Sequence, residues 1–195
     1  MSNSNGNGNA MTTTIPTSAK TPEQDEQQVS PQEKHTLSLF VANKPGVLIR
    51  IALVFARRGY NIDSLVVSPS NDPVFSTMNI VATGDKQVLD QILKQLNKLI
   101  DVVHAADRTG ENILQRELAL MKLNCEPEVR KDVLQLAHSL NCEVLDISEH
   151  SITLQITGES EKLDGANRVF ERYGVLEIMR TGKVLMARGE QNTIA

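Results

Sequence analysis

The stretch Asn43-Lys44-Pro45-Gly46-Val47-Leu48 decides the fold of this chain, because it joins two segments with different apolar periods. Before it, Leu37, Leu39 and Val41 alternate with other residues, which predicts a half-buried strand. After it, apolar residues recur at helical spacing as far as the stop signal at Gly59. The sequence therefore predicts a strand, a tight turn and a helix of about four turns.

The predicted start of this helix is suited to receiving an anion. The first N–H groups of a helix are unpaired and carry a partial positive charge, and Gly46 leaves room for a ligand to approach them. No side chain of the motif is equipped for catalysis, so it favours sensing over turnover. From the residues alone a simpler interpretation stays open, in which Asn43 caps the helix and Gly46 eases a turn.

The rest of the first half completes a β-α-β-β-α-β unit. Residues 61–69 and 74–83 read as a hairpin around a turn rich in proline, serine and asparagine. An amphipathic helix and a short strand at 102–105 follow, and the apolar face of that helix is marked by Leu89, Ile92, Leu93, Leu96 and Ile100. Such a unit closes into a four-stranded antiparallel sheet with two helices on one face.

The same order repeats in the second half of the chain. A strand begins near Glu117, and helices at 126–140 and 161–173 alternate with strands at 142–147 and 151–157, before 175–187 returns as a strand or hairpin. Thr83-Gly84-Asp85 and Thr157-Gly158-Glu159 occupy matching places. We expect an α+β protein of two ferredoxin-like units, which pairs as a homodimer because each unit buries little core alone.

Composition narrows the class of partner. A formal net charge of -4 and 3% aromatic residues argue against binding to nucleic acid or to an anionic membrane. The longest apolar stretch, Ile49 to Ala56, is too short to span a bilayer. The polar, partly acidic N-terminal region resembles no targeting peptide. With two cysteines outside any CxxC pair and no metal-ligand spacing among the histidines, we expect a cytoplasmic protein without a metal.

The motif and its surroundings strongly resemble the small regulatory subunit of acetohydroxyacid synthase, also called acetolactate synthase. The resemblance spans about residues 36–190 and rests on these stretches: 43–48, 57–65, Asp72-Pro73, 94–99, Arg116-Glu117-Leu118, Arg180-Thr181-Gly182 and Arg188-Gly189. It implies an N-terminal ACT domain at 35–107 and a C-terminal regulatory domain at 116–190. Residues 108–115 are then the linker, 1–34 a disordered tail and 191–195 a short tail.

The resemblance also implies a ligand and its contacts. A branched-chain amino acid, typically valine, would bind at an ACT dimer interface. Asn43 and Asn61 would hold its amino and carboxylate groups, and the N–H groups of Gly46, Val47 and Leu48 would receive the carboxylate. Leu48, together with Ile62 and Val67, would enclose the branched side chain.

Catalysis would belong to a separate large subunit that carries thiamine diphosphate, Mg²⁺ and FAD. This chain would activate that subunit and make it sensitive to feedback inhibition. It would itself carry no cofactor and no catalytic residue.

Three other functions compete with this one. A hydrolase of the acylphosphatase kind is disfavoured because the first loop offers Lys44 where a fixed arginine is expected. RNA binding of the RRM kind shares the element order, but Phe40 and Phe75 lack the accompanying basic and aromatic residues. A free-standing ACT sensor that controls another enzyme survives best, because the geometry of a ligand site does not reveal which protein responds to it.

Overall fold

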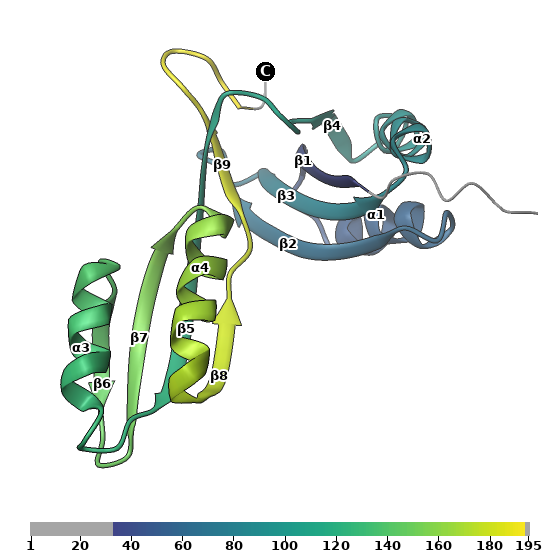
Figure 1. Cartoon of the computed structure of the whole chain (residues 1–195). Helices are drawn as coiled ribbons and strands as arrows, with labels where there is room; N and C mark the ends of the chain where they lie inside the picture. Colours follow the sequence, from purple (N-terminus) through teal and green to yellow (C-terminus); the bar gives the residue numbers. More distant parts are fainter. Residues whose placement is uncertain (1–32, 194–195) are drawn as a thin grey trace, which may run out of the picture.

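The computed structural model describes residues 33–193, which form two α+β domains joined by extended chain (Figure 1). Most of the tail expected at 1–34, and the last two residues, lie outside this range. None of the helices in the described range is long and apolar enough to cross a membrane.

The N-terminal domain has the predicted β-α-β-β-α-β order. Its antiparallel sheet has the strand order β2-β3-β1-β4, and both helices pack against one face. The elements are β1 (Glu33–Ala42), α1 (Val47–Ala56), β2 (Asn61–Pro69), β3 (Phe75–Gly84), α2 (Lys86–Leu96) and β4 (Val102–Asp107). The ferredoxin-like fold class predicted from the sequence is confirmed for this half of the chain.

The apolar spacing read from the sequence forms the core of this domain. Residues from β1, α1 and α2 are almost fully buried together: Leu37, Leu39, Val41, Val47, Ile51, Val54, Phe55, Leu89, Ile92 and Leu96. Two local expectations were wrong. α1 ends at Ala56, earlier than four turns require, and Ile100 is 98% exposed because α2 already ends at Leu96.

β1 is buried on both faces, although alternation predicted a half-buried strand. Thr36 and Ser38, which alternate with the apolar residues, are only 5% and 4% exposed. β1 lies between β3 and β4 at the centre of the sheet, and its small polar side chains are shielded by their neighbours on both sides.

The C-terminal domain repeats the arrangement with one addition. Its strand order is β6-β7-β5-β8, and β9 pairs with the first part of β5. The elements are β5 (Ile113–Asn124), α3 (Arg130–Ser139), β6 (Glu143–Ile147), β7 (Ser151–Gly158), α4 (Ser160–Phe170), the 3-10 helix Glu171–Tyr173, β8 (Val175–Arg180) and β9 (Val184–Ala187). The fold class is thus confirmed for the second half as well.

β5 is longer than the sequence indicated, and it organises the end of the chain. It begins at Ile113, so the first residues of this strand fall inside the stretch expected as the linker. β8 and β9 each pair antiparallel with β5, at 119–123 and 113–116 respectively. They are therefore successive strands along one partner and not the two arms of a hairpin.

The two domains touch where the connection between β8 and β9 packs on β2. Gly182 in this connection has φ 86°, and a Cβ built on it would lie 2.3 Å from Ser64 Oγ and 3.0 Å from Val66 Cγ2. Only glycine combines that backbone conformation with so close an approach. This contact brings β2 of the first domain against the second domain.

The repeated Thr-Gly-Asp/Glu motif begins the second helix of each unit through different contacts. In the first unit, the Asp85 side chain accepts hydrogen bonds from Gln87 N and Val88 N and caps α2. The Tyr60 hydroxyl donates to Asp85 O at 2.8 Å, with the ring lying over Gly84. In the second unit, Glu159 makes no side-chain cap. The backbone position is repeated, but the capping bond is not.

Gly84 and Gly165 give a matched test of this packing. A Cβ at Gly84 would lie 2.3 Å from the Tyr60 ring, whereas one at Gly165 in α4 meets only Arg168 Nη2 at 3.9 Å. We expect Gly84→Ala to lower the free energy of unfolding by about 1–3 kcal/mol through overpacking. Gly165→Ala should raise it by about 0.5–1 kcal/mol, because alanine favours a helix interior. Urea denaturation measures both, and equal effects would contradict the assigned Tyr60 contact.

Candidate functional site

The start of α1 has the geometry of an anion-binding corner. Gly46 is the residue before the helix and adopts a left-handed conformation, φ 83° and ψ -8°. The N–H groups of Gly46 and Leu48 have no partner among residues 33–193, while Val47 N–H makes only a long contact of 3.4 Å to Lys44 O. These donors are free for a ligand because no side chain caps the helix.

Asn43 does not cap α1, so the simpler interpretation of this residue is wrong. Its Nδ2 donates to Pro73 O at 2.9 Å, and its backbone N–H donates to Val74 O at 2.7 Å. Both bonds fasten the loop after β1 to the turn between β2 and β3. The side-chain oxygen of Asn43 keeps its capacity to accept a hydrogen bond from an ammonium group.

Arg50 is a residue of this corner that the sequence reasoning missed. Its Nη1 lies 3.5 Å from the position that a Cβ on Gly46 would take, and its Nη2 forms a 2.6 Å ion pair with Asp101. Arg50 stands four residues after Gly46, so the two lie on one face of the helix, and this spacing was the available signal. The guanidinium adds positive charge beside the free N–H groups, partly balanced by Asp101.

The other predicted ligand residues lie on β2. Asn61 begins the strand, is exposed, and donates from Nδ2 to Asp63 Oδ1 at 2.9 Å. Ile62 is partly buried and packs against the N-terminal core. Val67 is 46% exposed, and Leu48 on α1 is 44% exposed. Leu48 and Val67 are thus accessible to a ligand or to another protein surface.

The sheet register places Asn43 and Asn61 at opposite ends of the domain, and Val67, opposite Met78, lies nearer the Asn43 end. Asn61 is opposite Thr83, whereas Ala42, the residue before Asn43, is opposite Phe75. Thr83 and Phe75 are eight residues apart on β3 (83 − 75), which at ~3.4 Å per residue is about 27 Å. One copy of the chain does not bring Asn43 and Asn61 together.

An apolar surface runs along α1 beside the outer edge of the sheet. Leu48, Ile49 and Leu53 on α1 are 44%, 65% and 45% exposed, and Val67 of β2 is similarly exposed. Within residues 33–193, β2 pairs only with β3, so its outer edge has no strand partner. We call these residues and this edge the α1–β2 surface. A long edge strand beside exposed apolar residues is a typical site of protein association.

Comparison with known proteins matches both domains. Residues 37–104 match the model of the "AHAS small subunit-like ACT domain", and residues 116–189 match the model of the "Small subunit of acetolactate synthase". Together these cover more than half of the chain. The chain belongs to the family of acetolactate synthase small subunits. The resemblance read from the sequence is thereby confirmed.

Members of this family align with nearly the whole described region. A probable acetolactate synthase small subunit of Archaeoglobus fulgidus is 40% identical over 81% of this chain and 99% of its own length. The acetolactate synthase small subunit of Mycobacterium leprae is 41% identical over 80% and 92% of the two chains. The crystal structure of the small subunit from Thermotoga maritima has 35% identity and a TM-score of 0.73, with 82% and 99% covered.

The Arg50–Asp101 pair is expected to contribute charge to the corner and little to stability. The Arg50 side chain is 48% exposed, so solvent screens such a pair. Arg50→Gln should therefore lower the free energy of unfolding by less than about 1 kcal/mol, measured by urea denaturation. A loss well above that value would show that the ion pair anchors α1 to the start of β4.

Proposed function

We propose that this chain is the regulatory subunit of an acetolactate synthase. It activates the catalytic large subunit and makes that subunit sensitive to inhibition by a branched-chain amino acid, with valine as the first candidate. Membership of the small-subunit family supports the partnership. The chemistry that needs thiamine diphosphate, Mg²⁺ and FAD belongs, in this proposal, to the large subunit.

The separation of Asn43 from Asn61 supports an amino-acid site that is shared between two copies of the chain. Because one copy separates these residues by about 27 Å along the strand direction, at ~3.4 Å per residue, a site that uses both needs two copies. If two β2 edges pair antiparallel about a twofold axis, the Asn61 end of one strand meets the Pro69 end of the other. Pro69 is opposite Ser76 on β3, at the end of the sheet where Asn43 lies.

The chemistry of the joined site fits a free amino acid with an apolar side chain. The carboxylate of the amino acid accepts hydrogen bonds from the N–H groups of Gly46 and Leu48, and the positive charge of Arg50 lies nearby. The asparagine side-chain oxygens accept hydrogen bonds from the ammonium group of the amino acid. Each charge-assisted hydrogen bond contributes ~1.5–3 kcal/mol. Burial of the branched side chain against Leu48, Ile62 and Val67 contributes roughly 1.5–3 kcal/mol more. After the costs of association, affinity falls between about micromolar and millimolar, which suits a metabolite sensor.

The direct test of the proposal is reconstitution. The purified chain alone should show no synthase activity, and it should raise the turnover of a thiamine-dependent large subunit when the two are mixed. Valine, leucine and isoleucine should then be compared as inhibitors of the mixture. If the chain binds no such subunit, a free-standing ACT sensor becomes the better account.

Gly46 and Gly59 give a matched pair for the ligand corner. Both have positive φ, 83° and 65°, so alanine strains either backbone by roughly 1–2 kcal/mol. Only Gly46 lies at the free N–H groups of α1. Calorimetric titration should show valine affinity lowered at least about tenfold in Gly46→Ala and unchanged in Gly59→Ala. Equal losses would assign the effect to instability and count against this corner as the site.

Leu53 tests the proposed dimer. Leu53→Glu places a charge on the α1–β2 surface, while Ile100→Glu places one on a turn where the side chain is already 98% exposed. Burying an unpaired carboxylate at an interface is costly, so the first variant should sediment as a monomer in analytical ultracentrifugation and lose sensitivity to valine. The second should remain a dimer. A dimeric, valine-sensitive Leu53→Glu protein would exclude this surface.

A further inference from the structure

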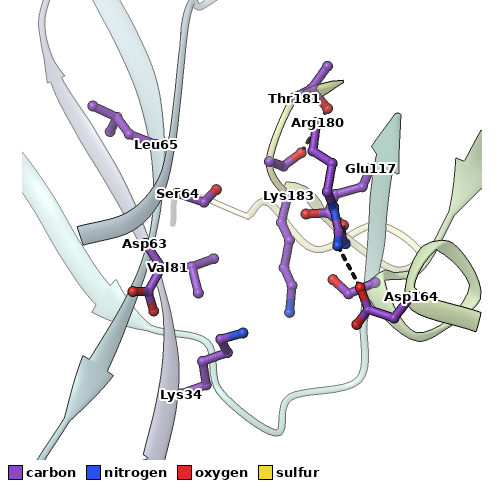
Figure 2. Close-up of a pocket in the computed structure, with 12 residues that line it drawn as sticks. Lys34, Asp63, Ser64, Leu65, Val81, Glu117, Asp164, Arg180, Thr181 and Lys183 are labelled. Carbon is purple, nitrogen blue, oxygen red and sulfur yellow. Dashed lines mark hydrogen bonds and ion pairs between the residues drawn. The ribbon is translucent and has the colours of Figure 1, made fainter. Parts of the chain in front are cut away.

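The cavity between the two domains lies outside the proposed amino-acid site. It has a volume of about 390 Å³, within the range of small-molecule sites. Its walls come from both domains and include β1, β2 and β3 on one side, and β5, α4 and the connection after β8 on the other (Figure 2). The side chains of Lys34 and Lys183 both end in the space between these walls (Figure 2).

The carboxylates of the cavity are already engaged. Arg180 donates to Glu117 and Asp164, each at 2.5 Å, and Glu117 is 8% exposed. Burial alone would lower the pKa of Arg180, but the hydrogen bonds and negative charges of both carboxylates outweigh it and raise that pKa. The third carboxylate, Asp63, accepts hydrogen bonds from Asn61 at 2.9 Å and Thr83 at 2.6 Å. Glu117 and Asp164 are thus paired with a cation, whereas Asp63 accepts only from neutral groups and forms no ion pair within residues 33–193.

The cavity also holds hydrogen-bond donors that have no partner in the described part of the chain. Within residues 33–193, Lys34 and Lys183 form no ion pair, and one comes from each domain. Ser64 and Ser160 also line the cavity, and their hydroxyl oxygens are buried without a partner among the described residues. Ser160 is the first residue of α4, an 11-residue helix with no side-chain cap, so the partial positive charge of this helix end lies beside a cavity whose three cationic side chains and three carboxylates otherwise balance.

We infer that this cavity binds a small carboxylate or phosphate anion that bridges Lys34 of one domain and Lys183 of the other. Two ammonium groups that share a cavity repel each other, and an anion between them removes this repulsion. The unpartnered hydroxyls of Ser64 and Ser160 are closed off from the cavity in this structure, and they gain hydrogen bonds from the same ligand by turning toward it. Because the anion contacts both domains, its binding stabilises their observed arrangement, held also by the Gly182 contact on Ser64.

The inference does not rest on the proposed function and is tested separately. Malonate and inorganic phosphate are titrated into the full chain by calorimetry, with separate arms to tell a carboxylate ligand from a phosphate. At least one should bind saturably. Lys34→Ala and Lys183→Ala should each weaken that binding at least about tenfold, because each removes a charged donor. Ser160→Ala should weaken it less.

Two controls separate this cavity from other sites. Lys131→Ala removes an equivalent exposed lysine on α3, whose residues do not line the cavity, and should leave the anion affinity unchanged. Gly46→Ala alters the amino-acid corner and should also leave it unchanged. If neither anion binds at concentrations up to about 10 mM, the inference is overturned. An equal loss of anion affinity in Lys131→Ala also overturns it, because such a loss indicates nonspecific attraction. A loss of anion affinity confined to Gly46→Ala overturns it as well.

Discussion

The antiparallel register of β1 and β2 on β3 is the constraint on which the rest of the structure depends. Backbone hydrogen bonds fix Ala42 opposite Phe75 and Asn61 opposite Thr83, and a slip of one residue would turn the apolar face of β1 away from the helices. The same register sets the two halves of the predicted amino-acid site at opposite ends of one sheet. In the proposed function, one subunit therefore holds only part of the amino-acid site, and the open edge of β2 beside exposed apolar residues of α1 is the surface proposed to pair with a second copy.

Two glycines lie where the fold contacts the other domain or faces the proposed ligand. Gly46 adopts a left-handed conformation that leaves the first N–H groups of α1 free, and Gly182 allows the second domain to approach Ser64. At both places a side chain would fill the space needed by a ligand or by the other domain. The first corner faces outward, whereas the second lies beside a cavity with unpaired lysines from both domains. The two proposed ligand sites therefore differ in their chemistry and in their place in the fold.

Much of the fold was readable from periodicity, and the errors have local causes. The helical spacing of Val47, Ile51, Val54 and Phe55 was confirmed because burial on one face is the dominant energy term. Ile100 was placed wrongly because its spacing fits a longer α2. The helix ends earlier, where the Asn97 side chain donates hydrogen bonds to Leu93 O and Ala105 O and accepts one from Ala105 N. Arg50 was missed at the ligand corner because its guanidinium position depends on Asp101, which is 51 residues away in sequence.

The sequence by itself determined the element order, the family and the glycine-containing helix start, because these follow from local spacing and from residue identity. Only the tertiary structure decided that Asn43 fastens a turn instead of capping a helix, that β8 and β9 extend along β5, and that Lys34 and Lys183 share a cavity. Each of these facts joins residues far apart in the chain. Such pairings are set by sheet register and domain packing, which no local pattern encodes.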